Sequence, residues 1–403
     1  MRRSPRGRRG RLGRACTVLA AAALVAGCGA VDALQPDPTW VPKPEGPPPA
    51  ELPPPEGPRA APTPGQPGQP GGPEAGAEDD PNVVATGLTL PWGLAVLPDG
   101  TALVGERRTG RILLVRPRRA PARELMRIPG LDTSGDGGLL GLAVSPTYRD
   151  DELVYAYLTT RTDNRVVRFV VGKAVTPVLT GIPRGRTGNG GRLQFGPDGM
   201  LYVGTGDAGR PALAASRRSL AGKVLRVTAF GRPAPRNPDP ASPVYSLGHG
   251  TLAGLCIGGP GQVYVTEPGS ATADEVNRVE AGRDYGWPAG PNGAARAGAA
   301  QPDRTLPAAT AGVGGCAVIE RGLFVATLTG ERLFALPLDS SGRTGAPTDH
   351  LAGAYGRLRT VVAGPDGALW LTTSNKDGRG KPTRQDDRVI RLLPPAGTTN
   401  SPA

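Results

Sequence analysis

From about residue 84 onward, the chain repeats one pattern of hydrophobic and polar positions. Each copy holds a hydrophobic strand, a tight turn, a second strand of Leu, Tyr or Val, a polar loop, and a short strand rich in Arg and Val or Ile. In the third copy the turn is Pro197-Asp198-Gly199 and the later strand is Lys223-Val224-Leu225-Arg226-Val227. Such short runs predict β-strands, and Asp-Gly supplies the positive φ that a tight hairpin needs.

Six copies of this unit follow one another at spacings of roughly 45 to 60 residues, which suits a four-stranded blade. Their second strands begin Leu103-Val104, Val154-Tyr155, Leu201-Tyr202, Val263-Tyr264, Leu323-Phe324 and Leu369-Trp370. The sequence therefore predicts an all-β, six-bladed β-propeller of antiparallel blades over residues 83–396. A β-sandwich with coincidental turns is the alternative. In a propeller, motifs after the first or second strand of several blades are expected to converge at one mouth.

Composition divides the rest of the chain. There are 61 Gly and 46 Pro, about a quarter of the 403 residues, which excludes a compact helical protein and a coiled coil. Residues 29–82 hold seventeen prolines and nine acidic residues, so they predict a disordered, extended tether. Residues 397–403 are expected to form a disordered tail.

The formal charge of +12 is unevenly placed: +7 lies in residues 1–28, −7 in the tether, and +12 in the propeller. Seven arginines followed by a short apolar run ending in Val25-Ala26-Gly27-Cys28 are typical of a lipoprotein signal, which predicts lipidation of Cys28. The run is shorter than the roughly 20 residues that span a bilayer. We expect an exported protein anchored to the outer face of the bacterial cytoplasmic membrane, which argues against nucleic-acid binding.

Two cysteines, Cys256 and Cys316, remain in the propeller, and an oxidising compartment would allow them to pair. Both follow a glycine near the start of a repeat, but Gly254-Leu255-Cys256 and Gly315-Cys316 differ by one position. A shift of one residue turns a strand side chain to the opposite face. The pairing is therefore left open.

Ordered motifs across all six repeats carry a resemblance to a known family. They include Leu90-Pro91-Trp92-Gly93-Leu94, Gly135-Asp136-Gly137-Gly138, Asn189-Gly190-Gly191-Arg192, Gly204-Thr205-Gly206-Asp207, Leu220-Ala221-Gly222-Lys223, Tyr285-Gly286-Trp287-Pro288, Arg357-Leu358-Arg359 and Thr373-Ser374-Asn375. On these residues the chain resembles the soluble, pyrroloquinoline-quinone (PQQ) dependent glucose, aldose and sorbosone dehydrogenases. The resemblance covers essentially the whole propeller.

The resemblance implies a general-base histidine directly before the Asn-Gly-Gly-Arg run, but this position is Gly188. The only histidines, His249 and His350, stand elsewhere. The acidic residue that orients the base in the family matches Asp207, which we expect to be the catalytic residue of a rearranged site.

For the cofactor, the resemblance implies contacts to PQQ from Asp136, Asn189, Arg357 and Arg359. Guanidinium groups pair well with the three carboxylates of PQQ. Several other contacts of the family are replaced, since Gly250, Thr251, Ala253 and Thr329 stand where polar or basic residues are expected.

The resemblance also implies a calcium ion held largely by backbone carbonyls. Gly269 and Ser270 are the expected backbone ligands, with water completing the oxygen shell. Asp274 and Glu275 could hold a structural calcium or brace the loop.

Two functions from different classes follow. One is a PQQ- and calcium-dependent dehydrogenase that oxidises the C1 hydroxyl of a sugar to the lactone. The other is a noncatalytic, lipid-anchored propeller that binds carbohydrate, a cell-envelope polymer or a protein partner. A third, a calcium-dependent lactonase, would need Asp207, Asn189 and Glu267 to converge on a metal.

Overall fold

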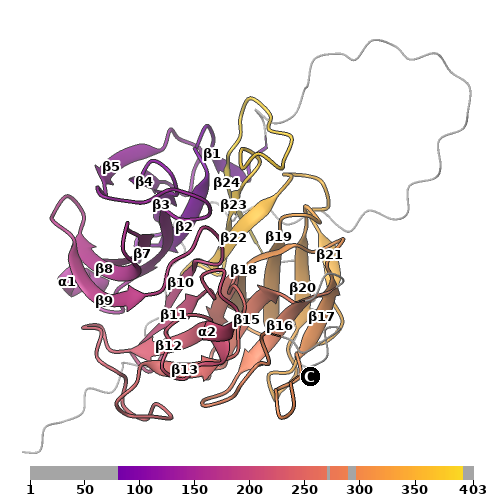
Figure 1. The fold of residues 1–403 in the computed structure, drawn as a ribbon. Coiled ribbons are helices and arrows are strands. Elements are labelled where there is room, and N and C mark those ends of the chain that lie inside the picture. The colour runs from indigo at the N-terminus through magenta and orange to yellow at the C-terminus, as the bar shows by residue number, and fades with distance from the viewer. Residues whose placement is uncertain (1–79, 270–272, 289–295, 394–403) are drawn as a thin grey trace, which may run out of the picture. The chain divides into compact units, whose positions relative to one another are not determined.

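The six repeats fold into six four-stranded antiparallel sheets in the computed structural model, which describes residues 80–269, 273–288 and 296–393 (Figure 1). The predicted six-bladed β-propeller is confirmed. The expected signal, Cys28, the tether up to residue 79 and the tail 397–403 lie outside the described residues. Among the residues that are described, no helix is both long and apolar enough to cross a membrane.

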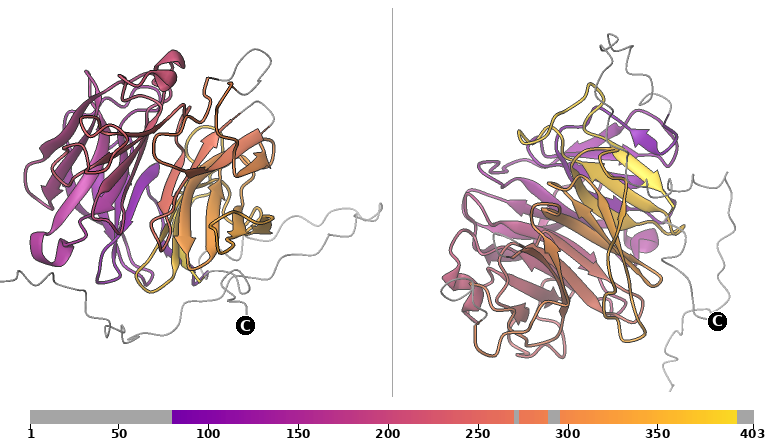
Figure 2. Two further views of the ribbon diagram at one scale, coloured as in Figure 1. Left: turned by 90° about the horizontal axis from the view of Figure 1, so that it is seen from below. Right: turned by 90° about the vertical axis from the view of Figure 1, so that its right-hand side faces the viewer.

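The blades follow one another along the chain, as the colours in Figures 1 and 2 show. The first three are β2 (Pro91–Val96), β3 (Ala102–Glu106), β4 (Arg111–Val115) and β5 (Arg123–Arg127); β6 (Leu139–Val144), β7 (Leu153–Thr159), β8 (Asn164–Val170) and β9 (Thr176–Ile182); and β10 (Gly190–Phe195), β11 (Leu201–Thr205), β12 (Lys223–Val227) and β13 (Val244–Leu247). The fourth and fifth are β14 (Gly254–Ile257), β15 (Val263–Pro268), β16 (Ala273–Val279) and β17 (Arg304–Pro307); and β18 (Val313–Ile319), β19 (Gly322–Thr327), β20 (Leu333–Pro337) and β21 (Thr348–His350). The sixth is β22 (Leu358–Ala363), β23 (Leu369–Thr373), β24 (Val389–Leu392) and β1 (Val83–Ala85).

The last blade takes its outer strand from the other end of the domain. β1 pairs antiparallel with β24, so the strand that begins the described chain completes the sheet that ends it. The first strands of neighbouring blades also contact one another in sequence, and β22 contacts β2. The ring is therefore closed both by strand pairing within the sixth blade and by packing between the sixth and first blades.

Burial explains why the middle strands lack a strict alternation of hydrophobic and polar residues. Every residue of β23 and nearly every residue of β7 is buried, because neighbouring blades cover both faces of each sheet. The outer strand β5, by contrast, is largely exposed and carries Arg123, Glu124 and Arg127. The hydrophobic core consists of clusters between adjacent blades rather than one central mass.

The Pro-Asp-Gly turns between first and second strands form as their sequences predict. Gly100, Gly199 and Gly367 have φ values of +80°, +70° and +76°. In the third blade, Oδ1 of Asp198 accepts the backbone N–H of Met200 at 3.0 Å. The aspartate thus satisfies a backbone donor that the tight turn leaves unpaired.

Within the described ranges, two short helices interrupt the β-structure. α1 (Tyr148–Asp151) lies between β6 and β7, and α2 (Ala212–Ala215) lies between β11 and β12. Lys223, at the start of β12, donates from Nζ to the carbonyls of Leu213, Ala214 and Ala221 at 2.9, 2.7 and 2.6 Å. This buried ammonium therefore anchors α2 and its following loop to the third blade.

Cys256 and Cys316 form a disulfide that joins the first strands of the fourth and fifth blades. Strict strand alternation argued against this pairing, but β18 is not a regular strand. Its register shifts between Val313 and Cys316, which places an irregularity at the two glycines between them. Such a bulge changes the face on which later side chains lie, so Cys316 reaches Cys256.

Candidate active site

The loops at one mouth of the propeller enclose a cavity of about 560 Å³. Its wall comes from residues near the start of the first strand or the end of the second, and all six blades contribute. These two chain positions lie at the same end of an antiparallel pair, whereas the turn after the first strand lies at the opposite end. Motifs that follow a first strand, such as the Pro-Asp-Gly turns, therefore do not line this cavity.

The wall carries far more positive than negative charge. Its charged residues are Arg107, Arg108, Arg186, Arg192, Arg359 and Arg379 against Asp136 and Asp377. Burial lowers the pKa of Arg107, and burial together with repulsion from Arg107 and Arg357 lowers the pKa of Arg359 to about 10 despite the nearby Asp377. Both guanidinium groups stay charged at neutral pH, so a bound anion would offset their mutual repulsion.

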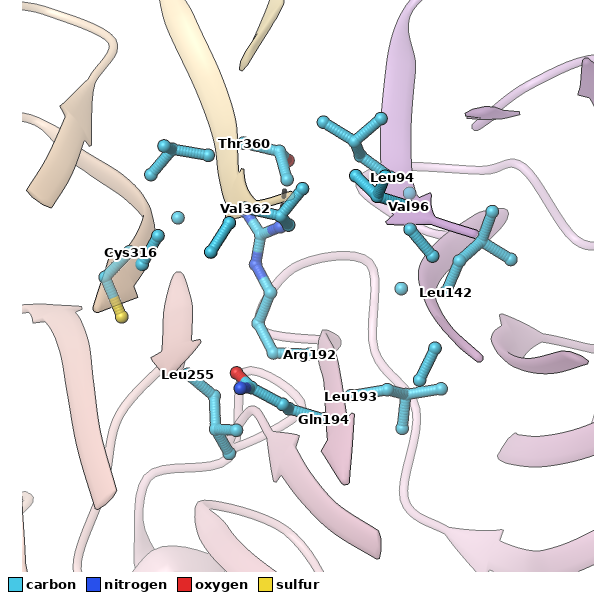
Figure 3. Close-up of a pocket in the computed structure, with 18 of the residues that line it drawn as sticks. Leu94, Val96, Leu142, Arg192, Leu193, Gln194, Leu255, Cys316, Thr360 and Val362 are labelled. Atoms are coloured by element: carbon cyan, nitrogen blue, oxygen red, sulfur yellow. Dashed lines mark hydrogen bonds between the residues drawn. The ribbon is translucent and has the colours of Figure 1, made fainter. Parts of the chain in front are cut away.

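Arg192 stands between this cavity and a second one deeper in the channel. It lines both, and the deeper cavity, of about 250 Å³, lies among the first strands of the blades (Figure 3). The guanidinium stacks over Trp92, 3.9 Å from the ring centroid, and Nη1 donates to Oγ1 of Thr360 at 2.9 Å. Burial and repulsion from Arg359 lower the pKa of Arg192 to about 9.

Asp136 lies on the cavity wall just before β6 and is held by the loop before β10. Its Oδ2 accepts the backbone N–H of Gly188 at 2.8 Å, and its Oδ1 accepts a hydrogen bond from Nδ2 of Asn189. Burial raises the pKa of Asp136 more than these two bonds and Arg107 lower it. The structure therefore gives Asp136 a fixed position and an elevated proton affinity.

Asn189 itself does not line the cavity. Its side chain is 1% exposed, and its Oδ1 accepts from the N–H of Gly185 and from Nδ2 of Asn164, both at 3.0 Å. In the structure this amide holds the Asp136 carboxylate, and the expected contact between Asn189 and a cofactor stays a prediction.

Gly188 lines the cavity with its backbone and is constrained by its neighbours. Its φ is +72°, and a Cβ placed on it would lie 2.5 Å from Oδ1 of Asp207. A histidine at this position would meet the same obstruction at its Cβ. Restoring the family's histidine therefore requires movement of the loop and not only a side-chain replacement.

We predict that Gly188→Ala lowers the free energy of unfolding by about 2–4 kcal/mol, because it combines a strained φ with overpacking. Gly199→Ala in the same blade is the matched control: its φ is +70°, but nothing lies within 4 Å of a Cβ added there. It should cost only about 1 kcal/mol. Urea unfolding of both variants measures the difference, and equal costs would contradict the steric argument.

Asp207 lies behind the cavity wall rather than on it. Oδ2 accepts the indole N–H of Trp287 at 2.9 Å, and Oδ1 accepts the N–H of Gly209 at 2.8 Å. The side chain is 6% exposed. Asp207 thus ties Trp287 to the third blade. Its side chain is not part of the cavity wall, and its catalytic role stays a prediction.

The two expected cofactor arginines have different positions. Arg359 lines the cavity, while Arg357 is 7% exposed and is not part of the wall. Nε and Nη2 of Arg357 donate to Oδ2 of Asp377 at 3.1 and 2.9 Å, and Nη2 of Arg359 lies 3.5 Å from the same oxygen. Burial would raise the pKa of Asp377, but bonding to Arg357 and Arg379 keeps it below its usual value.

The four positions at which cofactor contacts of the family are replaced also divide into residues on the cavity wall and residues away from it. Thr251 and Ala253 lie on the wall, so small or weakly polar groups stand there. Gly250 donates its N–H to Oε2 of Glu267 at 2.8 Å. Thr329 is not among the wall residues; it packs against Gly312, where an added Cβ would lie 2.3 Å from the Thr329 Oγ1.

The expected calcium ligands are only partly described, and the calcium site stays a prediction. Ser270 lies outside the described residues, and Gly269 is the last residue described before that gap. Oδ2 of Asp274 accepts the N–H of Val313 at 2.9 Å, and Glu275 accepts from Asn277 at 3.1 Å. Burial raises the pKa of both carboxyls. Across the described ranges, no group of three or more His, Cys, Asp or Glu side chains is arranged to hold a metal.

His249 belongs to a buried polar network outside the cavity. Its Nδ1 lies 2.8 Å from Oε1 of Glu267, its Nε2 lies 2.8 Å from Oγ of Ser246, and its ring stacks on Tyr285. This Ser-His-Glu arrangement resembles a hydrolytic triad, but Ser246 and His249 are 0% exposed. The network therefore fixes the loop before β14. The Glu267 carboxylate is bonded within this network, so it does not converge with Asp207 and Asn189 on a common metal site as a lactonase would require.

Several wall residues were not assigned a role from the sequence. Trp92 and Arg192 stand within motifs that carry the resemblance, so a signal for them existed. Arg107, Arg186 and Arg379 stand outside any assigned contact. For Arg107 and Arg186 the only signal was their place after a second strand or before a first strand, which is informative once the blade register is known. Arg379 also stands in the run from Thr373 to Gly380, which carries part of the resemblance.

Comparison with known proteins gives the same fold and identifies the family. The sequence model of the family described as Glucose / Sorbosone dehydrogenase matches residues 88–382. The PQQ-bound form of aldose sugar dehydrogenase from Streptomyces coelicolor is 44% identical, with a TM-score of 0.74, over 77% of this chain and 96% of that one. A putative oxidoreductase (glucose dehydrogenase) from Thermus thermophilus is 40% identical, with a TM-score of 0.70, over 77% of this chain and 98% of that one.

Among curated sequences, quinoprotein glucose dehydrogenase B of Acinetobacter calcoaceticus is 29% identical over 249 residues, which is 52% of each chain. The chain spans only slightly more than half the length of the curated relatives it matches.

Proposed function

We propose that this chain, which belongs to the glucose and sorbosone dehydrogenase family, is a PQQ-dependent dehydrogenase that oxidises the C1 hydroxyl of an aldose to the lactone. The observation that carries the proposal is the mouth cavity, whose wall holds six arginines against two aspartates. The 44% identity to a protein solved in its PQQ-bound form supports it.

The wall residues fit a tricarboxylate cofactor. Among the described residues, no carboxylate forms an ion pair with Arg107, Arg186 or Arg192, and Arg359 reaches Asp377 only at 3.5 Å. Of these arginines Arg192 is buried, Arg107 and Arg359 are half-buried and Arg186 is exposed. Guanidinium groups with so little counter-charge favour an anionic ligand, and they bind carboxylates in a bidentate manner. When bound, PQQ supplies a quinone that accepts two electrons from the sugar carbon.

The residues of this chain would bind the cofactor carboxylates and orient the cofactor in the cavity. Arg359 and Arg107 offer guanidinium groups to ligand carboxylates, while the nitrogens of Arg192 are engaged with Ala253, Thr360 and Arg359, so Arg192 contributes its charge. Asp377 and Ser374 hold the Arg359 side chain in place. These fixed groups preorganise a positive field, so the protein reorganises little when the ligand binds.

Two further parts of the proposal come from the sequence: the resemblance implies a calcium ion, and the arginine-rich N-terminus with its apolar run ending at Cys28 predicts export and lipidation. One is a calcium ion held by backbone carbonyls near Pro268 and Gly269, supported by the place of Pro268 on the cavity wall. The other is export with a lipid on Cys28, which would appear as a fatty-acid mass increase on the N-terminal peptide of the processed protein.

The test is dye reduction by the purified protein. With PQQ and Ca²⁺ added, an aldose should reduce an artificial electron acceptor, and omitting PQQ should abolish the signal. Removal of Ca²⁺ with a chelator should lower the rate, and readdition should restore it. Binding of a sugar polymer without PQQ binding or dye reduction would instead support a noncatalytic propeller.

A further inference from the structure

Oxidation of a C1 hydroxyl needs a group that accepts the hydroxyl proton, and such a base must lie within hydrogen-bond reach of it. The position that the resemblance gives to a histidine is Gly188, which has no side chain. His249 is completely buried in another network, and His350 lies in β21 of the fifth blade, away from the cavity wall. In the part of the chain that the structure describes, histidine therefore does not supply this base.

Two carboxylates line the cavity, and their environments differ. Asp377 bonds to Arg357 and lies 3.5 Å from Arg359, so its charge is already neutralised. Asp136 accepts only uncharged donors, the backbone N–H of Gly188 and the amide of Asn189. Two carboxylates whose surroundings push their proton affinities apart commonly have different chemical roles.

Asp136 is also firmly positioned beside Gly188. Its own N–H donates to the carbonyl of Arg186 at 2.9 Å, so the loop before β6 and the loop before β10 are bonded in both directions. Asn189, which holds one carboxylate oxygen, is itself held by Asn164 and Gly185. The Asp136 carboxylate is thus held rigidly at the cavity wall, next to Gly188, the residue that precedes the Asn-Gly-Gly-Arg run.

We propose that Asp136 is the general base of this chain and replaces the histidine that Gly188 lacks. The inference rests on the proposed function. Oxidation breaks the C1–H and O–H bonds and forms the C1=O bond of the lactone. PQQ, when bound, would supply the two-electron acceptor for the hydride from C1. The hydroxyl proton passes to the Asp136 carboxylate, which later releases it to water.

The charged and titratable groups around Asp136 set its pH response. Arg107 acts on it electrostatically, and Arg186 lines the same cavity and accepts the Asp136 N–H with its backbone carbonyl. The hydroxyl of the buried Tyr157 donates to the carbonyl of Asn189. Burial raises the Asp136 pKa above 3.8, and Arg107 opposes this rise. The base form is present above that raised pKa, so activity should fall as the pH falls through it.

The test compares Asp136→Asn with Asp132→Asn. Asp132 lies in the same loop, pairs with Arg184 and is not on the cavity wall, so it is the matched control. Asp136→Asn should lower the rate of sugar oxidation by about 10²- to 10⁴-fold and remove the acid limb of the pH profile. PQQ affinity, measured by absorbance titration, should stay the same or rise, because a negative charge has left the wall. Asp132→Asn should change neither, and Asp136→Glu should recover part of the rate.

A second readout does not need turnover. Infrared difference titration of the cofactor-free protein should show a carboxyl group that titrates above the usual range of an aspartate and is missing from Asp136→Asn. The inference is overturned if Asp136→Asn keeps its rate within about tenfold, or if rate and PQQ affinity fall together, which would make Asp136 a cofactor-positioning residue. If the wild-type protein binds PQQ and Asp136→Asn stays active, the inference about Asp136 fails but the proposed function stands. If the wild-type protein does not bind PQQ, both the inference and the proposed function are overturned.

Discussion

Replacing Arg359 with glutamine is expected to weaken PQQ binding by about two orders of magnitude. Removing one partner of a buried, hydrogen-bonded charge pair typically costs roughly 2–5 kcal/mol. The resemblance implies that two arginines, Arg357 and Arg359, contact the cofactor carboxylates. Of these two, Arg359 is the one that lines the cavity. Absorbance titration of PQQ into the purified variant measures the loss.

The fold should tolerate this change. Repulsion and burial already lower the pKa of Arg359 to about 10, so removing the charge relieves Arg192 and Arg107. The melting temperature should therefore stay constant or rise. Arg391→Gln is the control, because Arg391 lies in β24 of the same blade and pairs with Asp366 outside the cavity. Equal PQQ affinity in the two variants would contradict the assignment of Arg359.

Removing the disulfide is expected to lower the free energy of unfolding by about 4 kcal/mol in the chain-entropy model. The bond closes a loop between residues 60 apart and joins the first strands of the fourth and fifth blades. Chemical denaturation with and without reductant measures the effect on the wild-type protein and on a variant with Cys256→Ser and Cys316→Ser.

Reductant should destabilise the wild-type protein and leave the double variant unchanged. If the wild-type protein shows the same stability in both conditions, the two cysteines are not bonded in solution. Loss of the bond should also disturb the mouth, because Ala253 and Val313 lie on the cavity wall three residues before Cys256 and Cys316.

Much of the fold could be predicted from the sequence because each blade is a local hairpin unit. Tight turns such as Asp-Gly and short hydrophobic strands are signals that span a few residues, so the repeats are visible without knowledge of distant contacts. The pairing of β1 with β24 is different, since it joins residues about 300 positions apart and depends on where the ring closes. The bulge in β18, which depends on Gly314 and Gly315, likewise reversed an argument based on regular alternation.

The candidate site was only partly predictable, for a physical reason. Motifs indicated which residues lie near the mouth, and Asp136 and Arg359 do line it. Motifs could not show which way a side chain turns: Asn189 and Asp207 point into supporting hydrogen bonds, and Arg357 pairs with Asp377. The charge balance of the cavity depends on charged residues from four different blades, which no single motif contains.

A crystal structure of the protein soaked with PQQ and an aldose tests the proposed cofactor site and the role of Asp136 most directly. We expect the cofactor in the mouth cavity, with its carboxylates on Arg359 and Arg107 and the sugar C1 hydroxyl on the Asp136 carboxylate. A cofactor bound elsewhere, or a sugar hydroxyl held by Asp207 or another residue in place of Asp136, would contradict this expectation.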